Sequence, residues 1–210
     1  MVDRSTRMSS PHARLARLGF RQAEASWAHL QGLADDLPDV VIEALAAAPD
    51  PDLAVASLAA IAEAAPKAEL MTALANDSRL RERLAAVLGS SEGLGEFLVR
   101  HPESVDELAD PALAGPAESS DQARLGLLAA VGAEPDDVRP TAGLAPAAAA
   151  DALRVDYYRR LVRLAAQDLS QRWSVDQSGA ALADLAAGTL EASRLAARSA
   201  TSSATPSTGS

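Results

Sequence analysis

The sequence contains no cysteine and few aromatic residues, and both shortages exclude classes of protein. Without cysteine there is no disulfide framework and no thiolate metal site. Aromatic residues make up 3% of the chain, and runs of Val, Ile, Thr and aromatic residues with a period of two are missing, so we expect no β-strand. The three histidines, at 12, 29 and 101, include no i, i+4 pair that would hold a metal from one helix.

Membrane segments and positive charge are also scarce. No apolar run approaches the length of a membrane span, and the basic N-terminus lacks the apolar core of a signal peptide. We therefore expect a cytoplasmic protein with no membrane partner. The net charge is −10 and Lys67 is the single lysine, which disfavours nucleic acid as a partner because phosphate neutralisation supplies most of that affinity. This balance argues against a DNA-binding regulator, although LARLGFRQAEASWAHL faintly resembles a helix-turn-helix.

Alanine makes up close to a quarter of the residues, which is typical of slender, closely packed helices. We predict an all-α fold: an irregular bundle of about nine to eleven helices, the two longest near the C-terminus. The predicted organisation is a flexible N-terminus (1–10), a short-helix array (11–110), a linker with one short helix (111–146), two long helices (147–198) and a disordered tail (199–210). The tail is uncharged and nearly devoid of bulky apolar residues, so burial cannot offset its ordering entropy.

The segment LRERLAAVLGSSEGLGEFLVRHPESVDELADP, residues 80–111, is the most informative part of the chain. It predicts three short helices joined almost without loops. We expect Gly89 to end the first helix with a positive φ, Ser90 or Ser91 to cap the second, and Pro102 to begin the third.

Other helix boundaries are marked by caps and prolines. We expect Asp50 to cap a helix that begins at Pro51, and Asp121 to cap a helix that runs through Leu125, Leu128 and Val131 to Gly132. The apolar spacing of the long helices predicts which of their side chains are buried. On the first they are Leu153, Tyr157, Leu161, Leu164 or Ala165, and Leu169, and on the second Leu182, Leu185, Leu190 and Leu195.

The wording of the central segment resembles the N-terminal region of the glutamine-synthetase adenylyltransferases. In that family a helix ends in Gly, a Ser-rich turn follows, and a Leu-Gly-x-x-Leu-x-x-His-Pro-Glu run comes next. DALRVDYYRRLVRLAAQDLS, residues 151–170, is similar to a second family helix, and ARLARLGFRQAEA to the actinobacterial branch. The positions that match the run are Leu94, Gly95, Leu98, His101, Pro102 and Glu103.

The resemblance implies a large bifunctional enzyme that adds AMP to a tyrosine of glutamine synthetase and removes it by phosphorolysis. It also implies ATP and Mg²⁺ as cofactors of the full-length enzyme, and glutamine synthetase and a nitrogen-signalling regulator as partners. In the family, a Gly-Ser turn and an Asp-x-Asp pair, whose two carboxylates hold Mg²⁺, would follow the helix over 175–198. The sequence departs from the family after Arg198. We therefore expect no catalytic, cofactor-binding or metal-binding residue in this chain, and expect it to be inactive as a fragment, a frameshifted product or a truncation.

Several residues imitate functional motifs. Asp50 and Asp52 form an Asp-x-Asp pair, but they lie at a helix start with no Gly-Ser turn before them, so we interpret them as capping residues. The glycines at 89, 93 and 95 follow a helix, whereas a dinucleotide loop follows a strand. The Gly89–Ser90 pair has no Asp-x-Asp downstream. We interpret His101 as a capping or packing group, and Trp27 and Trp173 as anchors in or at the rim of the core.

The arginines at 154, 159, 160 and 163 leave two interpretations open. One is a solvated helix face with salt bridges, including one from Arg160 to Asp156. The other is a surface that packs on a catalytic domain or meets an acidic partner. For the chain as a whole, the alternative to an adenylyltransferase fragment is a stand-alone, non-catalytic helical interaction module.

Overall fold

The structure is a computed structural model that describes residues 10–34, 37–134, 137 and 140–203. Over this part of the chain it contains ten α-helices and two 3₁₀-helices and no strand, which confirms the predicted all-α fold. The chain divides into two compact units, Met1–Asp110 and Pro111–Ser210. Most of the predicted flexible N-terminus (1–9) and the last seven residues of the predicted tail lie outside the described residues.

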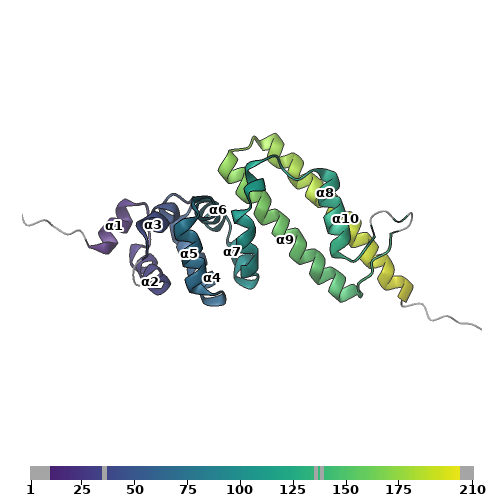
Figure 1. The fold of residues 1–210 in the computed structure, drawn as a ribbon, viewed down its shortest axis with the longest axis horizontal. Helices are drawn as coiled ribbons and strands as arrows, with labels where there is room; N and C mark the ends of the chain where they lie inside the picture. Colours follow the sequence, from purple (N-terminus) through teal and green to yellow (C-terminus); the bar gives the residue numbers. More distant parts are fainter. Residues whose placement is uncertain (1–9, 35–36, 135–136, 138–139, 204–210) are drawn as a thin grey trace, which may run out of the picture. The chain divides into compact units, whose positions relative to one another are not determined.

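The first unit is an array of short helices (Figure 1). Helix α4 packs against α2, α6 and α7, so it forms the centre of the unit. The elements are α1 (Pro11–Arg17), α2 (Ala23–Leu33), α3 (Asp39–Ala46), α4 (Pro51–Ala64), α5 (Lys67–Asn76), α6 (Ser78–Leu88), α7 (Glu92–Arg100) and the 3₁₀-helix η1 (Pro102–Ala109).

Polar caps begin several helices of this unit. The Asp50 carboxylate accepts the N–H groups of Asp52 and Leu53 at 3.1 Å each, as its position before Pro51 predicts. Ser91, one of the two predicted candidates, caps α7. The third helix of the central segment begins at Pro102 as predicted but is a 3₁₀-helix. The buried Arg83 guanidinium donates to two carbonyls at the C-terminal end of η1, those of Leu108 at 2.8 Å and Asp110 at 2.9 Å.

Gly89 ends α6, but the predicted positive φ is wrong. Its φ is −80°, which any residue adopts without strain. Glycine is required here because the chain passes close by: a Cβ at this position would lie 2.7 Å from Ala48 Cβ and 2.9 Å from the Asp50 carbonyl oxygen. The Asp50 N–H donates to the Gly89 carbonyl at 3.0 Å, so the end of α6 and the start of α4 are joined directly.

The second unit is built from few but long helices. It comprises the 3₁₀-helix η2 (Pro111–Ala114), α8 (Ser120–Ala130), α9 (Pro146–Gln171) and α10 (Val175–Ser203). Helix α10 packs against both α8 and α9 (Figure 1). It continues through Ser203, so residues 199–203 extend the helix rather than starting the predicted tail. The cap of α8 is Ser119, in a capping box with Gln122, and not the predicted Asp121, which lies inside the helix.

The buried face of the long helices differs in part from the prediction. Leu153, Leu185 and Leu195 are buried, as is Leu128, whereas Leu161, Leu164, Ala165 and Tyr157 are only partly buried. The prediction is wrong for three leucines of the long helices, which are exposed: Leu169, Leu182 and Leu190.

Small residues explain the choice of face on α10. Gly188 and Ala192 are buried, and a Cβ at position 188 would lie 2.8 Å from Leu127 Cδ1 and 3.3 Å from Arg124 Cα. Close approach of α8 therefore selects the face that carries these small residues. Leu182 and Leu190 are left on the opposite side, where the apolar pattern alone did not place them.

Candidate functional site

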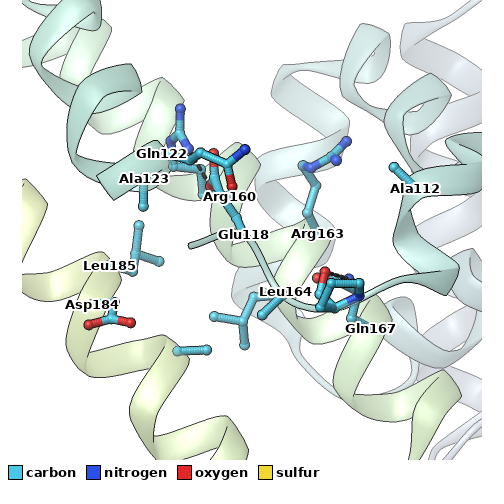
Figure 2. A pocket seen from close by; sticks show the side chains of 13 residues that line it. Ala112, Glu118, Gln122, Ala123, Arg160, Arg163, Leu164, Gln167, Asp184 and Leu185 are labelled. Atoms are coloured by element: carbon cyan, nitrogen blue, oxygen red, sulfur yellow. Dashed lines mark hydrogen bonds and ion pairs between the residues drawn. The ribbon is translucent and has the colours of Figure 1, made fainter. Parts of the chain in front are cut away.

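The second unit encloses a hollow of about 390 Å³ between the segment after η2 and helices α8, α9 and α10 (Figure 2). Its apolar lining includes Ala123, Leu164 and Leu185, and its polar lining includes Arg160 and Gln167. An apolar floor with a few convergent polar groups is typical of a binding site. We take this hollow as the candidate site and name it the α8–α10 hollow.

Arg160 is the central charge of the hollow. Its side chain is 16% exposed, and its Nε donates to Asp156 Oδ2 at 2.7 Å while Nη1 donates to the Glu118 carboxylate. Burial opposes the positive charge, but the hydrogen bonds from Glu118 and Asp156 outweigh that cost and raise the pKa of Arg160. A Cβ at position 126 would lie 1.8 Å from Arg160 Nη2, so Gly126 on α8 makes room for the guanidinium.

Two glutamine side chains fasten η2 and the segment after it to α9. Gln167 Nε2 donates to the carbonyls of Gly115 and Pro116 at 3.3 Å each, and Gln171 Nε2 donates to Leu113 O at 2.6 Å and Gly115 O at 3.1 Å. The wall of the hollow is therefore held by side chain–backbone bonds. Neither glutamine is predicted from the sequence, because a lone amide on a helix carries no spacing signal that separates it from a solvated one.

A second ion pair joins α8 to α10. Arg124 Nε and Nη2 each lie 2.7 Å from a carboxylate oxygen of Glu191, which is bidentate geometry. The hydrogen bond and charge of Arg124 lower the pKa of Glu191, and the same bond raises the pKa of Arg124. Residues 67 positions apart make this pair, so no local pattern predicted it.

The predicted arginine group divides between these surroundings. The expected pair of Arg160 with Asp156 is present, and Arg163 also lines the hollow. Arg154 pairs with Asp151 at 2.7 Å on the exposed side of α9, and Arg159 is exposed. The group is therefore not one continuous basic face.

The two acids of the Asp-x-Asp pair lie in the first unit and serve different helices. Asp50 caps α4, and Asp52 reaches across to the start of α2. The Asp52 carboxylate accepts the N–H of Arg21 at 2.8 Å, the N–H of Gln22 at 3.2 Å and the Ser26 hydroxyl at 2.5 Å. The N-cap residue of α2 makes no side-chain cap. Asp52, which is distant in the sequence, supplies the hydrogen-bond acceptor at the start of this helix instead. Both acids are occupied by structural hydrogen bonds.

The other residues that imitate functional motifs also make contacts typical of structural residues. The His101 ring centroid lies 4.9 Å from that of Phe97, and its Nδ1 lies 3.3 Å from Glu103 Oε1. Trp27 is half-buried with an edge-on contact to His12, and Trp173 is half-buried with its Nε1 donating to Gln171 Oε1 at 3.3 Å. At Gly95 a Cβ would lie 2.9 Å from Ser57 Oγ, which indicates close packing of α7 on α4.

Two absences hold for the described part of the chain only. Among those residues no group of three or more His, Cys, Asp or Glu side chains is placed to hold a metal ion. None of the helices resolved over the same residues is both long and apolar enough to cross a lipid bilayer. The chemistry that the α8–α10 hollow offers is hydrogen bonding and charge recognition by Arg160, Arg163 and amide groups.

The chain is similar to several curated proteins that share one name. It is 36% identical over 208 residues to the bifunctional glutamine synthetase adenylyltransferase/adenylyl-removing enzyme of Streptomyces avermitilis, a match that covers 92% of this chain. It is 40% identical over 191 residues to the enzyme of the same name from Leifsonia xyli, covering 88% of this chain. In both cases the chain spans 18% of the relative's length. No solved structure matches.

A sequence model of one family matches residues 81–209, which contain the end of the first unit and nearly all of the second. The match continues past Arg198, so the predicted departure from the family after that residue is wrong. The matched region includes the His-Pro-Glu run and the helix that carries Arg160, two of the three stretches on which the resemblance depends. More than half of the chain is thus accounted for by one family. The chain belongs to the glutamate-ammonia ligase adenylyltransferase family.

Proposed function

We propose that this chain is a non-catalytic helical segment of an enzyme that transfers AMP to a tyrosine of glutamine synthetase and removes it again. The family match over residues 81–209 carries the proposal. The relatives it resembles are named for both activities, and the chain spans about a fifth of their length. In such an enzyme ATP and Mg²⁺ would act at a nucleotidyltransferase centre formed by other segments.

The role we assign to the segment is that of a rigid support. The buried apolar centre around α4 and the fixed polar contacts of Arg160, Gln167 and Arg124 support this role, because they hold each unit in one arrangement without providing a reacting group. Glutamine synthetase and a nitrogen-signalling regulator are the proposed partners of the complete enzyme, in the cytoplasm.

Inactivity of the isolated chain is part of the proposal. Its support is that the one Asp-x-Asp pair spends its acceptors on helix N-termini and a serine hydroxyl. Mg²⁺ binding would compete with these bonds. Glu118, one of the acids that line the hollow, and Asp156 are likewise engaged by Arg160.

AMP transfer tests the inactivity directly. The purified chain is incubated with ATP, Mg²⁺ and glutamine synthetase, and modified tyrosine is measured by mass spectrometry, with the Streptomyces avermitilis enzyme as the positive control. We expect modification only in the control. AMP transfer by the chain above background would overturn the proposed inactivity.

A chimaera tests the supporting role. The matching segment of the Streptomyces avermitilis enzyme is replaced by this chain, and we expect AMP transfer to persist. A folded chimaera that has lost both activities would contradict the assignment. A matched chimaera that carries Leu98→Ala, which opens the core of the first unit, should be less active at raised temperature if the segment acts as a support.

A second candidate function is a stand-alone interaction module. The exposed apolar side chains on α10 favour it, since an open apolar helix face is typical of binding surfaces. In that case the chimaera would fail, while the chain alone would still associate with another protein surface.

A further inference from the structure

Helix α10 carries an apolar stripe that nothing in its own unit covers. Val175, Leu182 and Leu190 are 89%, 43% and 66% exposed. Exposed small residues continue the stripe, which consists of Val175, Gly179, Leu182, Ala186, Leu190 and Ala197. Spacings of four, three, four, four and seven residues keep all six on one helix face. We call this set the α10 stripe.

The α10 stripe has the dimensions of a helix–helix contact. From Val175 to Ala197 it is roughly 33 Å long at the rise of an α-helix. A small residue, Ala186, lies at its centre. Nearer the N-terminal end, a Cβ at Gly179 would meet nothing within 4 Å. Leu182 and Leu190 flank Ala186 at equal distances along the sequence. This arrangement repeats itself under a two-fold rotation centred on Ala186, so the stripe is complementary to an antiparallel copy of itself.

Charges beside the stripe distinguish the two possible directions. Asp176 lies near the N-terminal end of α10, and Arg194 and Arg198 lie near the C-terminal end, all exposed and on the same flank of the stripe. Two parallel helices would leave these charges on opposite sides of the contact, where they cannot pair. Two antiparallel helices would bring Asp176 of each copy towards the arginines of the other, as charge pairs in coiled coils set orientation.

The ends of the stripe are also complementary. Ala197 borders an apolar hollow of about 450 Å³ between α9 and α10, which is lined by Leu153 and Tyr157 among others. With Ala186 at the two-fold axis, position 175 of one copy lies opposite position 197 of the other. The most exposed apolar side chain, Val175, would therefore meet the apolar hollow of the second copy.

We propose that the α10 stripe is a homodimer interface on which a second copy of this chain docks in the antiparallel direction. Leu182 of each copy lies opposite Leu190 of the other, and Ala186 packs on Ala186. Two helices in contact over this length bury on the order of 1,000 Å² in total, which is the lower end for a specific interface. The dimer is therefore weak and depends on concentration. The proposal does not rest on the proposed enzymatic function.

Sedimentation equilibrium of the full chain across a wide concentration range tests the dimer. We expect the monomer to convert to a dimer as concentration rises, and the double variant Leu182→Asp/Leu190→Asp to stay monomeric. Both leucines are exposed, so the variant should keep the wild-type circular dichroism. The matched control is Leu125→Asp on α8, whose side chain is 41% exposed but lies outside the stripe; it should dimerise like the wild type. A wild-type chain that stays monomeric at every concentration, or a dimer that survives the double substitution, overturns the proposal.

Cross-linking tests the direction, and the absence of native cysteine makes it unambiguous. The variants Leu182→Cys and Leu190→Cys are oxidised separately and as a mixture. An antiparallel dimer gives a disulfide between the two variants in the mixture and little in either alone, because only the mixed pair brings the Cα atoms within disulfide distance. Efficient cross-linking of Leu182→Cys with itself would overturn the antiparallel arrangement. We also expect Asp176→Arg to weaken dimerisation. Adding Arg194→Asp and Arg198→Asp to that variant should restore it.

Discussion

Both units of this chain are built from helices, but they bury their large apolar side chains to different degrees. Among the described residues, the first unit exposes one large apolar side chain, Val40, whereas the second exposes six. These are Leu125, Leu144, Leu169, Val175, Leu182 and Leu190. The second unit therefore leaves more of its large apolar side chains open to solvent than the first.

Helix length explains the contrast. The helices of the first unit have 7 to 14 residues and turn back at caps such as Asp50 and Ser91, so each can be covered by several neighbours. Helices α9 and α10 have 26 and 29 residues, and α8 has 11. One short and two long helices cannot cover every side of one another. The second unit compensates with polar bonds from Arg124, Arg160, Gln167 and Gln171, and leaves one face of α10 open.

The largest effect is expected from opening the closed core. Leu98 is fully buried on α7, and Leu98→Ala should lower the free energy of unfolding by about 2–5 kcal/mol, through lost burial and the cavity left behind. Urea unfolding of the first unit can be followed by Trp27 fluorescence in a Trp173→Phe background. The matched control is Leu190→Ala on the open face, followed by Trp173 in a Trp27→Phe background at low concentration; it should change stability by less than about 0.5 kcal/mol. Equal losses in the two variants would contradict the contrast between the units.

An intermediate effect is expected at the close backbone contact in the first unit. Gly89→Ala should cost about 1–3 kcal/mol, because the added Cβ meets the Asp50 carbonyl oxygen, which cannot move without disturbing the start of α4. Thermal unfolding measures the loss. Gly32→Ala is the control: nothing lies within 4 Å of its Cβ position, so helix propensity should make it stabilising by up to about 1 kcal/mol.

A third glycine variant sharpens this comparison. If a positive φ were the requirement at position 89, Asn would be tolerated better than Ala. The observed φ of −80° predicts the reverse order, since Asn is larger than Ala and meets the same neighbours. Gly89→Asn that proves more stable than Gly89→Ala would show that the backbone conformation, and not the contact, selects glycine.

The smallest effect is expected at the polar bonds of the second unit. Arg124 lowers the pKa of Glu191 from its usual value of 4.5. The ion pair therefore stabilises the folded chain fully above that value, and the contribution is lost as the pH falls through the lower folded-state pKa. We expect Glu191→Gln to have a slightly lower melting temperature than the wild type at neutral pH, and the difference to shrink in acid. Both side chains are 39% exposed, so solvent screening keeps the effect small.

The control for this effect is Glu63→Gln, at an exposed carboxylate of α4. Its melting temperature should follow that of the wild type over the same pH range. A Glu191→Gln difference that grows as the pH falls would have the wrong sign and would exclude the ion pair as its cause.

Local signals in the sequence predicted the helices well and the long-range contacts poorly. Asp50, Pro51, Ser91 and Pro102 act on neighbours a few residues away, and their caps and turns are present where expected. The cap of α8 was placed on Asp121 although Ser119 with Gln122 satisfies both orphan donors. Two candidate residues of similar propensity lay within one turn, and only the hydrogen-bond geometry distinguishes them.

The candidate site depended on contacts between distant segments. The bond of Arg160 to Asp156 is an i, i+4 pair and was predicted, but its bond to Glu118 spans 42 residues. The hydrogen bonds of Gln167 and Gln171 to η2 and the segment after it join residues more than 50 positions apart. No pattern within one helix contains this information, since a helix face shows which side chains are neighbours but not which other element covers them.

The sequence by itself determined the all-α fold, the positions of most helix ends and the family, because each of these is written in spacings of a few residues or in continuous motifs. Only the tertiary structure decided that Asp52 caps α2, that Gly89 is required by a neighbouring backbone, and that α10 turns Gly188 inward and Leu190 outward. The last of these depends on how closely α8 can approach α10, and that distance is a property of two helices together rather than of either apolar pattern.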